Sequence, residues 1–431
     1  MEHQRILLIG GGGREHALAV SITKSPLCDK LFISPGNPGT AACGENIPLN
    51  LGDFDEILDF IRQKDITLCV IGPEKPLVDG LTDFLESHGI SVFGPTAAAA
   101  KLEGSKSFAK EIMQKYDIPT AGYQSFEKQD WHLVQKYIEK KQKWPIVLKA
   151  DGLAAGKGVF ICENKSDALE ALDSLQNDPS LSAASAKIVI EEFMEGEEVS
   201  VFAVSDGKIS KILFQAQDHK RIGEGDTGPN TGGMGAYGPA PLLDESGLAH
   251  IDEAVIKPTI RAMAKEGIPY KGILYAGLMM TTEGPKVVEY NCRFGDPECQ
   301  VILPALKTDI VEIMLAAANG NLDEISISIA KEYYTCVVLA SEGYPGAIEK
   351  GRVITGIPDT TDDSFVFHAG TSQSENGNIV TNGGRVLNVV AKGDTLKKSI
   401  EQAYSVLKSI QFDGMYYRRD IGKKGLDRLS E

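Results

Sequence analysis

The chain has 431 residues, of which 42% are hydrophobic and 24% charged, with a formal net charge of −16. This length exceeds what one hydrophobic core usually organises, so we expect about two to four globular domains. The acidic balance argues against nucleic acid or a membrane surface as a partner, because both are polyanionic and would repel the chain. No apolar run approaches the roughly 20 residues of a membrane span.

The seven cysteines are widely spaced, and no two of them form a C-x-x-C pair. An odd number of cysteines at such spacing fits neither a disulfide framework nor a zinc site. We therefore expect free thiols in a reduced compartment, the cytoplasm.

Residues 1–104 alternate short apolar runs with helical patterns. Strand, helix and strand in this order predict a parallel sheet with right-handed crossovers. Ligands of such sheets lie beyond the carboxyl ends of the strands. Those ends are expected at the sequences GGGGREH, SPGNPG, GPEKP and FGPT.

The rest of the chain combines further helices with longer strands. Helices are expected at 105–116, 130–142, 245–266 and 395–409. Between them, a glycine-rich interruption at 223–241 has no hydrophobic period and exceeds the usual length of a connector. We expect this interruption to be a functional or mobile loop. From about Ser328 onward the pattern changes to a strand-rich domain closed by the last of these helices.

The stretch LKADGLAAGKGVF begins as a strand and breaks into glycine and alanine around a second lysine. A Walker A loop needs a glycine, four free residues and then Gly-Lys-Ser/Thr. Here only three residues separate Gly152 from Gly156, and Gly158 stands where the hydroxyl should be. The sequence therefore excludes a Walker A loop but leaves open another kind of phosphate cradle.

Four glycines, 10–13, follow the first expected strand. A dinucleotide fingerprint needs its third glycine where this chain has Glu15, and an acid where the second strand ends in Ser34-Pro35. An NAD(P) site is therefore disfavoured. The glycines still bring backbone N–H groups to a helix N-terminus, which suits a phosphate or carboxylate. The alternative is a tight strand-to-helix turn without a ligand.

The run VVEYNCRFGDPE contains the most chemically informative spacing. Strand periodicity puts Glu289 and Asn291 on one face, and their oxygens suit a magnesium ion that bridges nucleotide phosphates. Arg293 follows with a guanidinium that could grip a carboxylate or phosphate. The alternative is an exposed strand edge with alternating polar residues.

The run VIEEFMEGEEVSV carries acids on both sides of an apolar pair. Its backbone at 191–194 could hydrogen-bond an adenine edge while Glu198 reaches ribose hydroxyls. The alternative is a solvated acidic turn between two strands.

The sequence QDHKR at 217–221 stands directly before the glycine-rich interruption. An acid, an imidazole and two cations in this place could clamp a substrate or form the base of a lid. A single histidine such as His219 is more often structural than catalytic.

Together these motifs resemble the phosphoribosylamine–glycine ligase family of the ATP-grasp superfamily. The resemblance extends from about Arg5 to Gly422. It is carried by GGGGREHAL, GPEKPLVDG, LEGSKSFAK, VLKADGLAAGKGV, QDHKRIGEGDTGPNTGGMGAYGPAP, YAGLM, RFGDPE and YRRDIG. Of these, RFGDPE and GPNTGGMGAY are the most specific.

The resemblance implies an α/β and α+β multidomain fold. Its N-terminal domain, 1–104, would hold a doubly wound parallel sheet and bind substrate. An ATP-grasp domain would span 105–327 with a mobile lid lobe at about 123–190, and a mixed or antiparallel α+β domain would span 328–431.

The resemblance also implies which residues form the site. The ATP site would consist of Lys106, Lys149, Gly156, Lys157, Gly158, Glu191, Glu192, Phe193, Met194 and Glu198. Glu289 and Asn291 would hold Mg²⁺ or Mn²⁺, and the strand YAGLMM before them supplies no third carboxylate. The catalytic residues would be Arg293, Asp218 and Lys149. The phosphoribosyl group would lie near Gly11, Gly12, Gly13, Asn37, Pro38, Gly39 and Glu74.

The implied reaction joins glycine to 5-phosphoribosylamine through glycyl phosphate, with ATP converted to ADP and phosphate. We expect small-molecule partners only, and a monomer or weak homodimer. One alternative is another purine-pathway ATP-grasp ligase or transformylase that uses formate or bicarbonate. Others are an NAD(P)-dependent oxidoreductase and an inactive nucleotide sensor, although the sensor should have lost Lys149, Glu289 or Asn291, which are all present.

Overall fold

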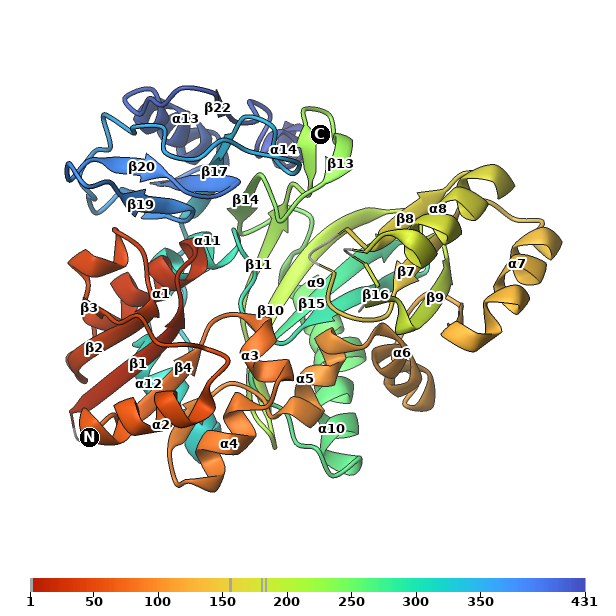
Figure 1. Ribbon diagram of the computed structural model, residues 1–431, viewed down its shortest axis with the longest axis horizontal. Helices are drawn as coiled ribbons and strands as arrows, with labels where there is room; N and C mark the ends of the chain where they lie inside the picture. Colours follow the sequence, from red (N-terminus) through yellow and green to blue (C-terminus); the bar gives the residue numbers. More distant parts are fainter. Residues whose placement is uncertain (1–2, 155–156, 180, 183, 431) are drawn as a thin grey trace.

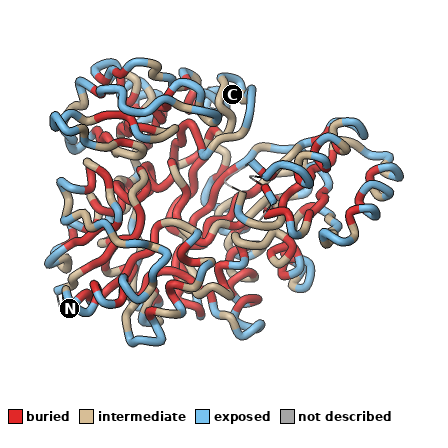
Figure 2. Tube along the Cα trace, viewed as in Figure 1, coloured by how far each residue is buried: buried red, intermediate tan, exposed pale blue. Residues whose placement is uncertain are grey.

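The computed structural model of the chain describes residues 3–154, 157–179, 181–182 and 184–430. Figure 1 shows the N-terminal and C-terminal parts stacked on one side of a long central sheet and a smaller lobe projecting from the other side. Figure 2 shows that buried residues run through the sheets and that exposed residues follow the outer helices and loops. Among the described residues, no helix combines the length and apolar character needed to cross a bilayer.

The N-terminal part is a five-stranded parallel sheet in the order β3-β2-β1-β4-β5. Its strands are β1 (Gln4–Gly10), β2 (Cys28–Pro35), β3 (Glu45–Asn46), β4 (Leu68–Ile71) and β5 (Ser91–Phe93). Its helices are α1 (Gly13–Thr23), α2 (Phe54–Gln63), α3 (Glu74–Val78), α4 (Leu81–Ser87) and α5 (Ala97–Gly104). Alternate residues of β1 enter different cores, Leu7 with α2 and Leu8 with α1. The predicted doubly wound sheet is confirmed.

A small lobe, residues 123–192, has its own antiparallel sheet in the order β6-β9-β7-β8. Its strands are β6 (Tyr123–Glu127), β7 (Ile146–Ala150), β8 (Val159–Cys162) and β9 (Lys187–Glu192), covered by α7 (Trp131–Lys140) and α8 (Lys165–Asn177). Trp131, Leu148, Leu172 and Ile190 belong to a hydrophobic core that contains only residues of this lobe.

The central and C-terminal strands form one nine-stranded sheet. Its members are β10 (Glu197–Asp206), β11 (Ser210–Asp218), β14 (Gly235–Gly238), β15 (Lys271–Thr281), β16 (Gly284–Asn291), β17 (Tyr333–Ser341), β18 (Ser364–His368), β21 (Arg385–Gly393) and β22 (Met415–Tyr416). Strand β14 pairs with β11 on one side and β17 on the other. The sheet therefore continues past the predicted domain boundary at 327/328.

The remaining helices are α6 (Lys106–Lys115), α9 (Glu245–Ile251), α10 (Lys257–Lys265), α11 (Cys299–Ala305), α12 (Ile310–Asn319), α13 (Leu396–Leu407) and α14 (Lys423–Ser430). The predicted helices at 105–116 and 395–409 are confirmed with slightly shorter bounds. Ser105 explains where α6 begins, because its hydroxyl accepts a hydrogen bond from the N–H of Phe108.

The expectation of an irregular loop at 223–241 is wrong. This stretch completes a hairpin of β12 (Arg221–Gly223) and β13 (Thr227–Asn230) and then forms β14. The hairpin has no hydrophobic period because its strands are short and contain one apolar side chain, with β12 partly buried and β13 mostly exposed. A second short hairpin, β19 (Thr371–Gln373) and β20 (Ile379–Thr381), lies in the C-terminal part.

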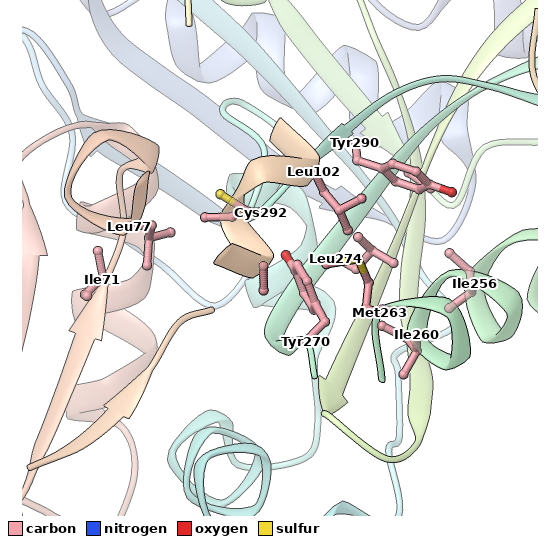
Figure 3. Close-up of a cluster of buried hydrophobic side chains, with 14 of the residues drawn as sticks. Ile71, Leu77, Leu102, Ile256, Ile260, Met263, Tyr270, Leu274, Tyr290 and Cys292 are labelled. Atoms are coloured by element: carbon pink, nitrogen blue, oxygen red, sulfur yellow. The ribbon is translucent and has the colours of Figure 1, made fainter. Parts of the chain in front are cut away.

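One hydrophobic core joins the N-terminal sheet to the central sheet. Figure 3 shows Leu102 of α5 beside Leu274 of β15 and Tyr290 of β16, with Ile71 and Leu77 of the same core further towards the N-terminal sheet. Burial of this kind stabilises by about 25 cal/mol per Å² of apolar surface, so a continuous core holds the two parts as one body. The small lobe, in contrast, has a core of its own.

Two histidines lie where the N-terminal and C-terminal parts meet. His16 Nδ1 accepts a hydrogen bond from the N–H of His368 at 2.8 Å, and the His16 ring packs edge-on against Phe367. Burial, together with the nearby His368, lowers the pKa of His16 to about 3. Burial lowers the pKa of His368 to about 4. The interface therefore contains two neutral imidazoles.

Acid should weaken this interface. In the unfolded chain, His16 and His368 become protonated near pH 6.5, whereas in the folded chain they stay neutral. The free energy of unfolding therefore falls as the pH drops below 6.5 towards the folded pKa values. Each such histidine costs about 1.4 kcal/mol per pH unit in that window. We expect the melting temperature to fall between pH 7.5 and 5.5, and to fall less steeply for His16→Gln. Substitution of the exposed His250 by Gln should leave the wild-type slope; an unchanged slope in His16→Gln would contradict the assignment.

Candidate active site

The predicted metal ligands lie together at the edge strand of the central sheet. Glu289 and Asn291 stand two residues apart on β16, opposite Gly277 and Tyr275 of β15. The positive charge of Lys220 lowers the pKa of Glu289 against the cost of burial, and lysines 149 and 106 add to this effect. An ionised carboxylate beside an amide oxygen fits a hard divalent cation.

The described residues hold no group of three or more His, Cys, Asp or Glu side chains that could bind a metal ion. A metal at Glu289 and Asn291 would therefore need further ligands from a bound molecule or from water. Phosphate oxygens are the usual additional ligands of Mg²⁺ in nucleotide sites.

Lys220 connects two predicted site residues. Its Nζ lies 2.7 Å from Glu198 Oε2 and 3.4 Å from Glu289 Oε1. The structure thus brings the predicted ribose ligand and the predicted metal ligand to the same ammonium group. In the sequence, Lys220 was visible only as one of two cations in QDHKR, and nothing in that motif indicates which acids it meets.

Asp218 lies at the end of β11, within a cluster of acids. Burial and the charges of Glu298, Glu198 and Glu289 raise the pKa of Asp218 to about 8, although Lys220 acts in the opposite direction. Glu298 is itself buried, and its Oε1 lies 3.3 Å from the hydroxyl of Ser200. Glu298 was not among the predicted site residues, although it ends the specific motif RFGDPE.

A buried carboxylate holds two lysines at the small lobe. Glu191 lies 2.9 Å from Lys149 Nζ and 3.0 Å from Lys110 Nζ. Burial alone would raise the pKa of Glu191, but the two lysines outweigh it and lower that pKa. Burial lowers the pKa of Lys110 to about 8, although Glu191 opposes it. The Glu191 side chain therefore faces lysines, so only its backbone remains for the predicted adenine contact.

Lys110 is a second residue that the sequence did not assign. It lies one helical turn from Lys106 on α6, and this i, i+4 spacing was the available signal. Lys106 Nζ donates to the carbonyl oxygen of Gly152 at 3.1 Å. Lys149 also donates to the carbonyl oxygen of Val288 on β16 at 3.3 Å, so it contacts both the small lobe and the central sheet.

The segment between β9 and β10 is accessible, as an adenine-binding hinge requires. Glu192 and Phe193 are exposed and Met194 is partly buried. In the glycine loop of the small lobe, Lys157 is exposed and Gly158 is buried at the start of β8. The predicted contact Gly156 lies outside the described residues.

Arg293 and Glu74, both predicted substrate contacts, meet each other. Arg293 Nε lies 3.2 Å from Glu74 Oε2, and its Nη2 lies 2.7 Å from Glu103 Oε1. Glu103 also accepts a hydrogen bond from the N–H of Cys292 at 2.7 Å. Burial disfavours the guanidinium charge, but Glu103 and Glu74 outweigh it and raise the pKa of Arg293. Asp218, a further predicted substrate contact, interacts electrostatically with Lys220 and Glu298.

The glycines after β1 surround a buried acid. Glu15 Oε2 accepts a hydrogen bond from the N–H of Gly12 at 2.7 Å, and Asp296 Oδ2 accepts one from the N–H of Arg14 at 3.4 Å. A Cβ on Gly72 would come within 2.3 Å of Glu15. Glu15 thus fills the space that a dinucleotide fold keeps open, which agrees with the disfavoured NAD(P) site. Two N–H groups of the expected anion cradle therefore bind internal carboxylates.

The loop after β2 is held by its own asparagine. Asn37 Oδ1 accepts hydrogen bonds from the N–H groups of Gly39 (2.8 Å) and Thr40 (3.0 Å), and its amide donates to carbonyl oxygens of Gly11 and His368. The side chain of Asn37 is therefore committed to the fold. Asn37, Pro38 and Gly39, all predicted substrate contacts, can therefore contact a substrate through the surface of the loop and its carbonyl oxygens. Their side chains have little hydrogen-bonding capacity left to donate to it.

The sequence matches three models of one family in chain order. They are described as Phosphoribosylglycinamide synthetase, N domain (residues 4–103), ATP-grasp (A) domain (104–299) and C domain (334–424). The chain is 47% identical over 424 residues to the phosphoribosylamine–glycine ligase of Agrobacterium fabrum, which covers 98% of this chain and 99% of that protein. It is 46% identical over 432 residues to the enzyme of the same name from Rhodopirellula baltica, with 99% of each chain covered.

Solved structures show the same architecture. The crystal structure of phosphoribosylamine–glycine ligase from Thermotoga maritima has a TM-score of 0.84 and 36% identity, covering 97% of this chain and 100% of that one. A biotin carboxylase domain from Hydrogenobacter thermophilus, solved with MgADP, has a TM-score of 0.74 at 16% identity and shows the fold alone, covering 97% and 92% of the two chains. The ordered match to all three family models and the full-length relatives show that the chain belongs to the phosphoribosylglycinamide synthetase family, whose central domain is an ATP-grasp.

Proposed function

We propose that the protein is a phosphoribosylamine–glycine ligase. It forms the amide bond between glycine and 5-phospho-D-ribosylamine, gives glycinamide ribonucleotide, ADP and phosphate, and acts in purine biosynthesis. The observation that carries this function is the full-length identity of 46–47% to relatives of that name. A transformylase or another ATP-grasp ligase is disfavoured because all three domains match one family.

The reaction brings anionic groups together, and the lysines of the site offset their repulsion. A carboxylate oxygen of glycine attacks the γ-phosphorus of ATP, which releases ADP and gives glycyl phosphate. The amine of phosphoribosylamine then attacks the acyl carbon, loses a proton and displaces phosphate. Lys149 and Lys106, with Lys110 behind them, would place positive charge along the phosphates.

Glu289 and Asn291 would hold the metal, for which we propose Mg²⁺ or Mn²⁺. Bound there, the ion would screen the phosphate oxygens during transfer. The low pKa of Glu289, set by Lys220, keeps its carboxylate ionised for this purpose.

The remaining assignments are also proposals. Glu192, Phe193 and Met194 would line the adenine, and Glu198 would reach the ribose after releasing Lys220. Arg293 would orient the glycine carboxylate, and Asp218 would meet an amino group. The phosphoribosyl group would lie against the loops after β1 and β2 and against Glu74.

Acyl phosphates hydrolyse, so the site must exclude water while glycyl phosphate exists. We propose that the lobe at about 123–190 closes as a lid within the 105–327 domain, with Lys157 on its loop. The separate core of this lobe supports an independent movement. All seven cysteines are free thiols, which supports a reducing compartment, proposed as the cytoplasm.

The substrate requirement tests the function directly. The protein should release phosphate from ATP only when glycine, phosphoribosylamine and Mg²⁺ are all present, because the acyl phosphate is consumed only by the amine. Phosphoribosylamine can be formed in place from ribose 5-phosphate and ammonia, and the amide product is detected by mass. Equal phosphate release with formate in place of glycine would refute the proposal.

The metal assignment is tested by Glu289→Ala. Loss of this carboxylate removes one of two protein ligands, so kcat should fall by about 100-fold or more. The matched control is Glu283→Ala, an exposed acid in the turn before β16, which should keep wild-type activity. Unfolding in urea shows whether the variant folds; a folded Glu289→Ala that retains activity would remove the assignment.

The phosphate-binding role of Lys149 predicts a different pattern. In Lys149→Met, Glu191 keeps Lys110 as its partner, so the lobe should fold. The loss of one preorganised cation should lower kcat/KM for ATP by about 10² to 10³. Lys187→Met changes a lysine of β9 that pairs with Glu127 at the lobe surface and should leave kcat/KM unchanged. Equal effects of the two substitutions would show that the charge of the lobe matters and the position of Lys149 does not.

A further inference from the structure

Arg418 is a fully buried cation that the reaction does not use. Its side chain is 1% exposed. The guanidinium donates to both oxygens of Asp420 at 2.8 and 2.7 Å, to Asp226 Oδ1 at 2.9 Å and to the carbonyl oxygen of Arg221 at 3.0 Å. Two of these partners, Asp226 and Arg221, lie on the β12–β13 hairpin, which is almost two hundred residues away in the sequence.

The neighbours of Arg418 hold the same hairpin. Asp420 Oδ2 accepts a hydrogen bond from the N–H of Gly225 at 2.8 Å, in the hairpin turn. Lys424 forms an ion pair with Asp226. Gly422 donates its N–H to Nε2 of the buried His219 at 3.4 Å. The segment 418–424 therefore follows the hairpin from its first strand to its turn.

The hairpin has two further polar contacts to the C-terminal segment: the carbonyl oxygen of Ile222 accepts from the Tyr416 hydroxyl at 2.8 Å, and Glu224 Oε1 accepts from the N–H of Arg419 at 3.2 Å. Its strands are partly or fully exposed, and none of its residues belongs to a hydrophobic core of the described structure. A two-stranded hairpin without an apolar face is marginally stable in water. Polar contacts therefore anchor the hairpin, and Arg418 is the buried member of this set that reaches both its first strand and its turn.

The position of the hairpin determines that of Lys220. Arg221 is the next residue in the chain, and Thr231 at the other end of the hairpin donates to the carbonyl oxygen of Lys220 through its N–H (2.7 Å) and its hydroxyl (2.8 Å). The side chain of Lys220 meets Glu198 at 2.7 Å and Glu289 at 3.4 Å. The ammonium group of Lys220 lies between the predicted ribose ligand and the predicted metal ligand, so a shift of the hairpin would displace it from both.

We propose that Arg418 is a positioning residue: by fixing Arg221 and Asp226 it places Lys220 against Glu198 and Glu289 and so sets the affinity of the site for a metal–nucleotide complex. The proposal rests on the proposed function for the identity of that complex. It assigns a role in the active site to a residue of the C-terminal domain that touches none of the reacting groups.

The affinity of the protein for ADP with Mn²⁺, measured from the electron paramagnetic resonance signal of the ion, tests the proposal without requiring the ligation reaction. Arg418→Met should weaken binding by about 10-fold, the lower range for residues that support a metal site. Arg419→Met removes the same charge from the next, exposed residue and should bind as the wild type does. If Arg418→Met fails to fold, Asp226→Asn removes only the hairpin partner and should show the same direction of change.

A double-mutant cycle separates positioning from general destabilisation. If Arg418 acts through Lys220, Arg418→Met should change affinity less than about 2-fold when Lys220 is already Gln, because coupled residues are not additive. Equal affinity of Arg418→Met and wild type, or a full 10-fold loss in the Lys220→Gln background, would overturn the proposal. Failure of the wild type to ligate glycine, with the coupling intact, would instead refute the proposed function alone.

Discussion

The pairing of one short strand holds the active site to the C-terminal domain. Strand β14 lies between β11 and β17 and leaves no room for side chains at its ends. A Cβ on Gly235 would come within 2.6 Å of the carbonyl oxygen of Cys336, and one on Gly238 within 2.3 Å of the Phe214 ring. Gly235 and Gly238 thus serve sheet continuity, and this continuity brings Arg385 and Arg418 to the glycine-rich segment. Arg385 donates to the carbonyl oxygen of Gly232 at 2.7 Å, just past the hairpin that Arg418 contacts.

An acidic chain with a net charge of −16 can bind anions only where cations are concentrated. The structure concentrates them by pairing them with acids: Lys149 and Lys110 with the buried Glu191, and Lys220 with the exposed Glu198. A buried pair is expensive to form and stabilises little by itself. Such pairs fix the positions of the lysines before the substrate arrives, so less reorganisation is needed when phosphate charge develops.

Local sequence pattern predicts the elements and residue pairs that depend on neighbouring residues, and it does not reveal contacts between distant residues. Period-two alternation was enough to place Glu289 and Asn291 together, and strand–helix alternation was enough for the N-terminal sheet. Glu103 could not be found, because its partner Arg293 is 190 residues away. The polar β12–β13 hairpin looked like a loop because its strands are fixed by Arg418 and not by an apolar face. Glu191 looked like a solvated acid because its burial depends on lysines from α6 and β7.

The cores determine which contacts must change when substrate binds. The N-terminal and central sheets share one core, so Glu289, Lys220 and Arg293 belong to one body, whereas Lys149 belongs to the small lobe with its separate core. Lys149 nevertheless donates to the carbonyl oxygen of Val288 on β16. A phosphate that binds Lys149 must therefore compete with this contact and with Glu191, while Glu191 retains Lys110. Binding of ATP would thus exchange the Lys149–Val288 contact for one through the nucleotide, so that closure of the lobe depends on the phosphates being present.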